Sequence, residues 1–270
     1  MKKKVRKNSF WVLLFLVIVL LCMTAPLYAV YSPTEVDLGS VLQKPNAVHW
    51  FGTDRFGRDL FTRVLYGARI SLMVGIVTAV INTIIGVIYG GIAGYVGGRV
   101  DMWMMRLTDI LYSIPELLYI ILIMLIFGSN VRSIIIGVCV VGWISMARMV
   151  RSQIITLKEQ EFALAAFVLG ANSRRILFKH LIVNSLGTII VTVTLMIPQA
   201  IFMEAFLSFV GVGISAPMAS LGTLAQDART YLEIFPYQML FPVAAICVTI
   251  FSLNFIGEGL NSALNPKGKR

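Results

Sequence analysis

The chain has 270 residues, of which 58% are hydrophobic and only 13% charged, and its mean hydropathy is +0.84. A water-soluble domain carries about 25% charged residues, so this composition argues against a soluble globule and for a polytopic membrane protein. The net charge of +10 also occurs in nucleic-acid-binding proteins, but in a membrane protein the position of the basic residues matters more than their sum, and no nucleic-acid partner is expected. The three cysteines lie far apart in apolar runs without CxxC spacing, which is typical of small core residues rather than of a metal site.

The chain begins with a basic cluster and an apolar run that together resemble a signal peptide in outline. The run covers approximately residues 10–29, which is longer than the usual apolar region of a signal peptide, and it lacks a clean A-x-A cleavage site. We therefore interpret residues 1–30 as a cytoplasmic N-terminus and an uncleaved first transmembrane helix. A cleaved leader is the alternative, and it leaves the remaining topology unchanged.

Five further apolar runs approach the length of about 20 residues that crosses a bilayer as a helix. Inside lipid each run must be helical, because every backbone polar group needs a partner within its own segment. The fourth run is short. The runs cover approximately residues 70–95, 110–127, 133–147, 185–207 and 237–257. The sequence thus predicts an all-α polytopic membrane protein with six transmembrane helices.

Basic residues are distributed unevenly between the two sides of this topology. With the N-terminus inside, the cytoplasmic segments hold sixteen of the 23 lysines and arginines, and the outside segments hold seven. Lys and Arg concentrate in cytoplasmic loops, so both termini are expected in the cytoplasm. The predicted regions are an N-terminal region of residues 1–30, an extracytoplasmic segment 31–69, a five-helix core 70–260 that includes a cytoplasmic loop 158–184, and a cytoplasmic tail 261–270.

The second predicted span carries a glycine at every fourth position, namely Gly86, Gly90, Gly94 and Gly98. This spacing aligns the four glycines on one helix face. A face without side chains lets another helix approach closely, so we expect a helix to pack along it.

Two glutamates lie well within the predicted spans, Glu116 in the third and Glu204 in the fifth. Such residues are candidates for function, because an ionised group in a bilayer is costly unless it faces water or a partner. Glu204 either lines a pathway or makes a hydrogen bond between packed helices. Three residues of the same span are further candidates for lining a pathway: Met196, Met203 and Phe206.

The cytoplasmic loop between the fourth and fifth spans is predicted to form two short helices joined by a turn. From residue 158 an apolar but slim face recurs at helical spacing, formed by Phe162, Ala165, Ala166 and Leu169. Gly170 fits the position just after this helix, where glycine adopts a left-handed backbone most readily. Asn172 or Ser173 is expected to cap the second helix. The loop either docks into a groove on another protein or rests on anionic lipid with its arginines near the headgroups.

This loop resembles the EAA coupling loop of bacterial ABC-importer permeases, which reads EAA, three residues and then glycine. Aligned on Gly170, the chain has Leu164 where the family has glutamate, and Val183 where the family has a proline near the end of the loop. In the family this loop docks onto the ATP-hydrolysing subunit. The resemblance implies that role for Glu161, Phe162, Leu164, Ala165, Ala166, Leu169, Gly170, Arg174 and Arg175.

A second stretch, HWFGTDRFGRDLFTRVLYGARISL at residues 49–72, resembles the signature of C-type permease subunits of dipeptide, oligopeptide and nickel importers. The stretch SFVGVGISAP…LGTLAQDAR at residues 208–229 is similar to the outer segment between spans five and six of the same family. Together these matches extend from the first span to NFIGEGL near the end. The outer motif residues are Gly52, Thr53, Asp54, Gly57, Arg58 and Asp59.

Several arginines of this outer motif run against the charge bias, so nearby acidic residues are expected to pair with them. Asp54 and Asp59 lie within reach, and Arg55 and Asp59 have the i, i+4 spacing of a helical pair. Gly52 and Gly57 favour turns ahead of an amphipathic helix. We interpret the segment as an outer ledge that helps receive a binding protein, with a purely structural brace as the alternative.

Motifs for catalysis and nucleotide binding are absent from the sequence. There is no G-x-x-x-x-G-K-[ST] phosphate loop, no HExxH and no GxSxG, and GVGISA at residues 211–216 lacks the third glycine of a dinucleotide fingerprint. The two histidines are predicted on opposite sides of the membrane. The chain is therefore expected to be non-catalytic and to hold no cofactor or metal.

The resemblance implies the type I (MetI-like) permease fold and a place in the bacterial cytoplasmic membrane. It implies one half of the translocation pathway of an ATP-driven importer of peptides or nickel chelates. The implied partners are a homologous second permease, two ABC ATPases that bind ATP and Mg²⁺, and an extracytoplasmic binding protein. Two alternatives remain: a scaffold protein whose basic loop holds lipid, and a stand-alone secondary transporter or channel. The latter usually has more intramembrane ionisable groups and an internal repeat.

Overall fold

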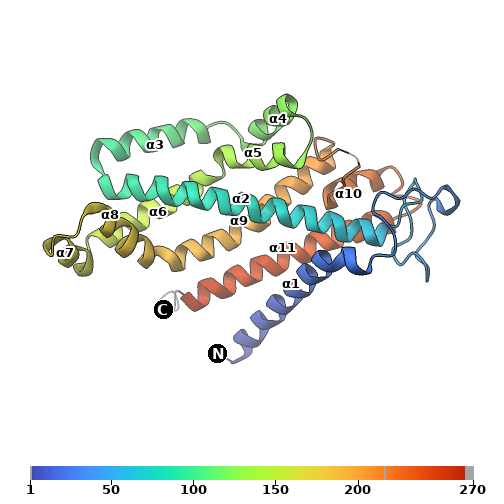
Figure 1. Ribbon diagram of the computed structural model, residues 1–270, viewed down its shortest axis with the longest axis horizontal. Coiled ribbons are helices and arrows are strands. Elements are labelled where there is room, and N and C mark those ends of the chain that lie inside the picture. The colour runs from blue at the N-terminus through green and yellow to red at the C-terminus, as the bar shows by residue number, and fades with distance from the viewer. Residues whose placement is uncertain (1, 216, 265–270) are drawn as a thin grey trace.

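The computed structural model describes residues 2–215 and 217–264, with the side chains of residues 2–8 excepted. Within these ranges the chain is helical and has no strand. Figure 1 shows an elongated bundle with α7 and α8 at one end, here the α7 end, and the segment between α1 and α2 at the other, here the loop end. The helices are α1 (Lys2–Tyr28), η1 (Leu38–Ser40), α2 (Leu60–Val96), α3 (Gly98–Tyr112), α4 (Glu116–Phe127), α5 (Val131–Val141), α6 (Trp143–Lys158), α7 (Glu161–Val168), α8 (Ser173–Arg175), η2 (Ile176–Leu181), α9 (Ile182–Val210), α10 (Leu221–Arg229) and α11 (Tyr237–Leu264).

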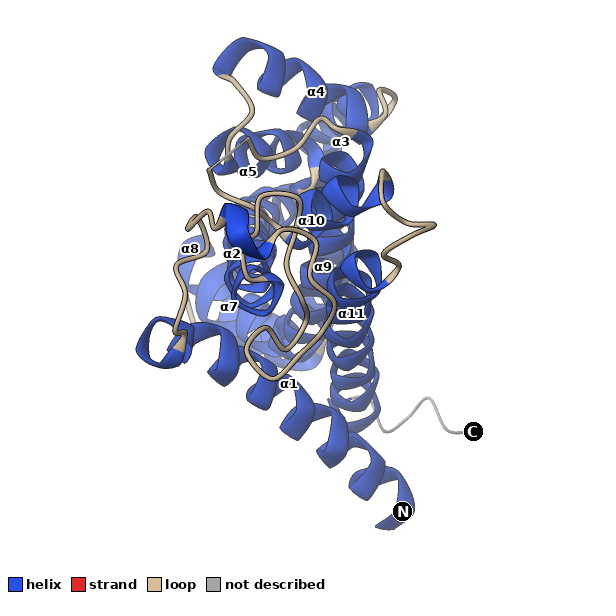
Figure 2. Cartoon of the chain, turned by 90° about the vertical axis from the view of Figure 1, so that its right-hand side faces the viewer, coloured by secondary structure: helices blue, strands red, loops and turns tan. Residues whose placement is uncertain are grey.

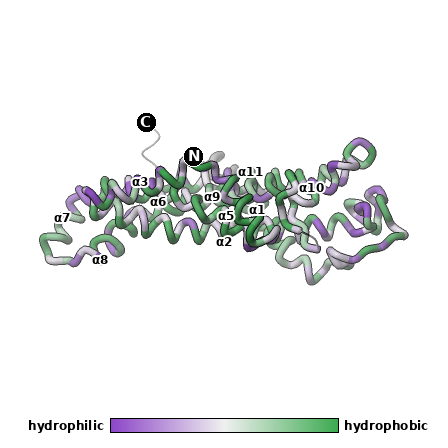
Figure 3. The backbone as a smooth tube through the Cα atoms, turned by 90° about the horizontal axis from the view of Figure 1, so that it is seen from above, coloured by the Kyte–Doolittle hydropathy of each residue, from purple (hydrophilic) through white to green (hydrophobic). Residues whose placement is uncertain are grey.

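Five helical segments of the described chain are long and apolar enough to cross a membrane, and a bent pair raises the number to six. The pair is α3 and α4, which meet at 72°. Figure 3 shows hydrophobic residues along the central helices and hydrophilic residues gathered mainly toward the two ends. The predicted all-α fold is confirmed, and six spans are reached when the bent pair counts as one.

The third predicted span is not a continuous helix. Pro115 has no amide hydrogen and disfavours the α conformation of the residue before it, so α3 ends at Tyr112 and α4 begins at Glu116. The predicted run 110–127 therefore contains the bend, and α3 adds a helix that the hydropathy pattern did not mark.

The second and fourth spans are longer than predicted. The second begins ten residues earlier, at Leu60, so that the predicted amphipathic helix and the span form one helix of 37 residues. The fourth continues from α5 through Gly142, which has right-handed helical backbone angles, to Lys158. The apolar run ended at residue 147 because the following turns are polar, although the helix itself continues.

The glycine face of α2 packs against α6, as the spacing predicts. A Cβ added at Gly86 would lie 2.6 Å from the Cβ of Met146, and one at Gly90 would overlap the backbone carbonyl of Ala147. A Cβ at Gly94 would lie 2.8 Å from the Arg151 carbonyl oxygen, also on α6. Gly98 does not belong to this face, because it has a positive φ of 56° and begins α3. The prediction is thus confirmed for three of the four glycines.

The first helix contacts the rest of the bundle at its edge. Trp11 of α1 stacks on Phe255 of α11 with ring centroids 4.4 Å apart. Only 11% of the most apolar stretch of α1 is buried. Figure 2 shows α1 running obliquely away from the other helices toward the N-terminus. The predicted tail 261–270 falls partly in α11, and residues 265–270 lie outside the described residues.

Candidate functional site

The α7 end contains the predicted loop, and its turn forms as the sequence indicates. Gly170 has a positive φ of 78°, its amide donates to the Phe167 carbonyl, and the Ala171 amide donates to the Ala166 carbonyl. These two bonds form a Schellman motif, which satisfies the last carbonyls of α7. The predicted helix end at Gly170 is confirmed, although α7 begins at Glu161 rather than at residue 158.

The helix after this turn is capped as predicted, but it is not short. The side-chain oxygen of Asn172 accepts from the Arg175 amide at 2.8 Å, so Asn172 is the capping residue. From Ser173 the chain continues through α8 and the π-helical η2 into α9, giving one helical segment that ends at Val210. The loop is therefore built into the fifth span, and the turn at Gly170 joins two different helices of the bundle.

Three of the four residues of the slim face predicted for docking are exposed, and α7 packs on the bundle through another face that shares only Ala166 with it. Ala163 and Ala166 are buried, whereas the predicted face residues Phe162, Ala165 and Leu169 are exposed. Ala163 was not predicted, although it lies three residues before Ala166 and so shares its face. The structure leaves most of the predicted loop residues exposed: Glu161, Phe162, Leu164, Ala165, Leu169, Gly170, Arg174 and Arg175.

The C-terminal turn of α7 presents apolar side chains with no described partner helix over them. Phe167 is 70% exposed, Val168 82% and Leu169 86%. Phe167 and Val168 were missed by sequence reasoning, because only the more regular spacing of Phe162 and Leu169 was counted. An exposed apolar tip of this kind at the end of a bundle marks an interaction surface.

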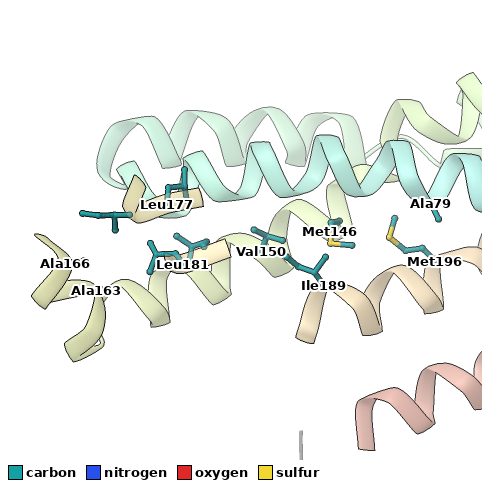
Figure 4. Close-up of a cluster of buried hydrophobic side chains, with 11 residues drawn as sticks. Ala79, Met146, Val150, Ala163, Ala166, Leu177, Leu181, Ile189 and Met196 are labelled. Atoms are coloured by element: carbon teal, nitrogen blue, oxygen red, sulfur yellow. The ribbon is translucent and has the colours of Figure 1, made fainter. Parts of the chain in front are cut away.

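One packed apolar cluster connects α7 with the middle of the bundle. Ala163 and Ala166 pack with η2 and α6 residues such as Leu181 and Val150, and the same cluster continues to Ala79 of α2 and Met196 of α9. Figure 4 shows these side chains in a row from α7 toward α2 and α9. α7 and the middle of α9 therefore contribute to one continuous packed cluster.

A cavity of about 610 Å³ lies where this cluster reaches α2 and α9. Ala79 and Met196 belong both to the cluster and to the wall of the cavity. Of the predicted pathway residues, Met196 and Met203 line the cavity, and Glu116 lines it at the first residue of α4. Further wall residues are Thr78, Asn82, Tyr112, Ile114, Pro115, Val138, Val141, Gly142, Ser145, Gln199, Ala200 and Phe202.

The predicted pathway residues Glu204 and Phe206 do not line this cavity. Glu204 is fully buried, and its carboxyl group accepts hydrogen bonds from the hydroxyls of Ser71 at 2.6 Å and Ser208 at 2.8 Å. The Ser220 hydroxyl donates to the Ser208 hydroxyl at 3.3 Å and so extends this hydrogen-bonded group. Of the two roles considered for Glu204, the structure contains the packing hydrogen bonds. Phe206 is 44% exposed and is not among the residues that line the cavity.

At the loop end, Asp54 organises the turn of the outer motif. Its carboxylate accepts from Arg58 Nε at 2.7 Å and from the Phe56 and Arg58 backbone amides. Arg63 Nη1 lies 3.5 Å from the same carboxylate. The expected pairing of Asp54 with motif arginines is therefore present.

Asp59 has a different partner from the predicted one. It does not pair with Arg55, because residue 55 lies in the turn before α2 and is not helical. Instead Asp59 caps α2 by accepting from the Thr62 amide at 2.8 Å, and its other oxygen lies 3.0 Å from His49 Nδ1. His49 was not predicted to contact this carboxylate.

The outer motif is attached to the start of α11. The Thr53 carbonyl accepts from Gln238 Nε2 at 3.1 Å, and the Tyr237 hydroxyl donates to the Gln43 carbonyl at 2.8 Å. Gly52 and Gly57 both have positive φ, and a Cβ at Gly57 would overlap the Asp37 backbone. Five of the six motif residues are buried, all except Arg58. Their contacts are those of a brace within the chain.

Asp227 of α10 is a further acidic partner that sequence reasoning missed. Its carboxylate lies 3.7 Å from Arg63, 3.8 Å from Arg55 and 3.9 Å from Arg58. It therefore joins α10 to the outer motif electrostatically. Asp227 lies in the stretch 208–229, which resembles the outer segment of the family. Its position in the sequence did not indicate which arginines it would pair with.

No group of three or more His, Cys, Asp or Glu side chains suited to a metal ion occurs among the residues that the structure describes. The described acidic residues of α3 that form ion pairs each have one arginine partner, Asp109 with Arg148 at 2.9 Å and Asp101 with Arg151, whereas Asp54 and Asp227 at the loop end share Arg58 and Arg63.

Comparison with known proteins agrees with this geometry. A family model described as "Binding-protein-dependent transport system inner membrane component" matches residues 86–270. The chain is 46% identical over 255 residues to the oligopeptide transport system permease protein OppC of Bacillus subtilis, covering 94% of this chain and 84% of that protein. It is 45% identical over 270 residues to the dipeptide transport system permease protein DppC of the same organism, covering 100% and 84%. It is 44% identical over 259 residues to OppC of Escherichia coli K12, covering 95% and 86%. The chain therefore belongs to the binding-protein-dependent transport system inner membrane components, the permease subunits of ABC importers.

Proposed function

We propose that the chain is a permease subunit of an ATP-driven peptide importer and that it transmits movement from an ATPase to the pathway. The observation that carries this proposal is the single apolar cluster that contains both Ala163 and Ala166 of α7 and the cavity wall residues Ala79 and Met196. An ATPase that displaces α7 displaces a packed row of side chains ending at the cavity. The exposed apolar tip of α7 supplies the surface on which the ATPase binds.

The remaining partners follow from the family. A homologous second permease covers the open side of the cavity, beside which Phe202 is 59% and Phe206 44% exposed. A binding protein docks at the loop end, where Val48 and Trp50 are exposed next to the buried brace. Two ATPases bind ATP and Mg²⁺, and this chain contributes no catalytic residue.

Peptides are the substrate class because the relatives reported above carry oligopeptide and dipeptide transport in their names. Nickel chelates receive no comparable support. One of the two histidines, His49, is buried against Asp59 at the loop end, and it does not line the cavity. We propose the bacterial cytoplasmic membrane as the location, with the α7 end and both termini on the cytoplasmic side.

The proposal is tested by placing a charge on the tip of α7. Val168→Asp is expected to leave the chain inserted but to reduce ATPase co-purification and peptide uptake together by about tenfold or more, because burying an unpaired carboxylate in an apolar contact is strongly unfavourable. The measurements are recovery of the ATPases with a tagged permease and uptake of a labelled tripeptide into proteoliposomes containing the complete transporter.

Val30→Asp is the matched control. Val30 is 86% exposed and follows α1 at the loop end of the bundle, opposite α7. The same change there should leave ATPase binding unchanged. Equal effects of both variants, or ATPase binding that survives Val168→Asp in full, would overturn the docking role. Uptake by vesicles that contain this chain without ATPases would favour a stand-alone transporter instead.

A further inference from the structure

The cavity in the middle of the bundle contains a hydrogen-bond acceptor that no described group satisfies. Asn82 is only 3% exposed and belongs to the cavity wall, yet its Oδ1 has no hydrogen-bond partner among the described residues. A buried amide oxygen normally accepts a hydrogen bond, because an oxygen that is buried without one has lost its bonds to water and gained nothing in return. An unpaired amide oxygen on a residue of a cavity wall is a candidate acceptor for a polar group that enters the cavity.

A carboxylate without a described partner lies in the same wall. Glu116 is the first residue of α4, and no hydrogen bond or ion pair in the described chain involves its side chain. The amide groups at the start of α4 favour a negative charge there, but they do not neutralise it. Among the described residues that line the cavity there is no lysine, arginine or histidine.

A basic side chain that contacts a residue of the cavity wall is already engaged. Arg148 stacks 4.8 Å above the ring of Tyr112, which lines the cavity, but its guanidinium is bound to Asp109 at 2.9 Å. The cavity therefore combines one negative charge and one free neutral acceptor with the amide of Gln199 and the hydroxyl of Ser145. Its volume of about 610 Å³ lies within the usual range of ligand pockets, about 300–1,000 Å³.

We propose that this cavity is a subsite for a primary ammonium group of the transported solute. An ammonium carries one positive charge and three N–H donors, which match the Glu116 carboxylate and the Asn82 oxygen. An anionic group is disfavoured by Glu116. The inference rests on the proposed function, and it adds that the permease itself contacts the amino terminus or a lysine side chain of the peptide during transfer.

The test measures whether a peptide amine occupies the cavity. Ser145→Cys, in a background with the three native cysteines replaced by alanine, places a thiol in the wall at an exposed position. The complete transporter, in nanodiscs, is treated with N-ethylmaleimide in the presence of trialanine, N-acetyl-trialanine or an N-acetylated tripeptide with a central lysine. We expect trialanine or the lysine peptide to slow labelling by about tenfold, the effect of one charge-assisted hydrogen bond, and N-acetyl-trialanine not to do so. The two active probes separate the amino terminus from the side chain as the source of the ammonium.

Glu116→Gln should abolish the difference in labelling rate between free and acetylated peptides, and Asn82→Leu should reduce that difference. The matched control is Glu258→Gln, because Glu258 is an exposed carboxylate of α11 outside the cavity. Equal labelling with free and acetylated peptides, while the transporter still imports trialanine, would overturn the subsite and leave the proposed function intact. No import of any peptide would instead overturn the proposed function. Loss of the second permease from the Glu116→Gln complex would also overturn the subsite, because the carboxylate would then be holding a basic side chain of that partner.

Discussion

Single residues at the loop end have structural tasks that their sequence spacing did not reveal. Asp59 combines two of them, since one carboxylate oxygen caps α2 and the other meets the buried His49. Asp54 likewise accepts a hydrogen bond from the Phe56 amide within its turn and forms ion pairs with Arg58 and Arg63. Side chains with several buried partners fix the chain locally, and this explains why the outer motif is so dense in polar residues.

Replacement of Asp59 measures this fixation. Asp59→Ala is expected to destabilise the protein by about 1–3 kcal/mol, because it removes a helix cap and leaves a buried histidine without its acceptor. Asp59→Asn keeps an acceptor for the cap and should have a smaller effect. The measurement is the midpoint of thermal unfolding of the purified transporter.

Asp37→Ala is the control for this substitution. Asp37 also caps a helix, but the cap is exposed and serves only the short η1, so its loss should change the midpoint little. If Asp59→Ala abolishes uptake while stability and membrane abundance stay normal, the ledge contacts a partner rather than bracing the chain.

At the scale of elements, the contact between α2 and α6 depends on the absence of side chains. The predicted glycine spacing brings Gly86, Gly90 and Gly94 against the backbone and side chains of α6. Without water to drive helices together, close backbone approach supplies the packing attraction between them. This contact supports one wall of the cavity, since Asn82 and Ser145 lie on these two helices.

Gly90→Ala tests the contact directly. The added Cβ would overlap the Ala147 carbonyl, so α2 and α6 must separate, and we expect a loss of stability of about 1–3 kcal/mol. Gly91→Ala is the neighbouring control, because its Cβ would meet Ile182 and Leu177 at an ordinary 3.6 Å. Equal unfolding midpoints for the two variants would contradict this close packing of α2 on α6.

At the scale of the whole molecule, the two ends differ in kind. The α7 end presents an exposed apolar tip on a packed row of side chains, whereas the loop end is a network of ion pairs and backbone hydrogen bonds. The α7 end suits a partner that binds and displaces α7, and the loop end suits a rigid platform on which a partner docks. The proposed orientation places the α7 end in the cytoplasm, where ATP is present.

Labelling in spheroplasts tests this orientation. In the cysteine-free background, Val36→Cys should react with a membrane-impermeant maleimide added outside, and Val168→Cys should react only after the cells are opened. Both side chains are exposed, at 55% and 82% respectively, so accessibility within the chain does not differ enough to explain a contrast. The reverse pattern would invert the topology and remove the basis for ATPase docking on α7.

The sequence by itself determined the membrane class, the helical fold, the glycine face and the turn at Gly170. These depend on local or periodic properties: hydropathy over a window, spacing along one helix, and the backbone freedom of glycine. It did not determine the bend before Glu116 or the extension of the fourth span past residue 147, because hydropathy does not register where a helix ends.

Only the tertiary structure decided which residues meet across elements. The pairing of Asp227 with the outer arginines, the burial of Glu204 among three serines and the cavity around Asn82 each join segments that are far apart in the chain. Such contacts depend on how the helices are placed side by side, and spacing along one helix carries no information about its neighbour. The physical reason is that packing is a property of pairs of surfaces, whereas a sequence motif describes one of them.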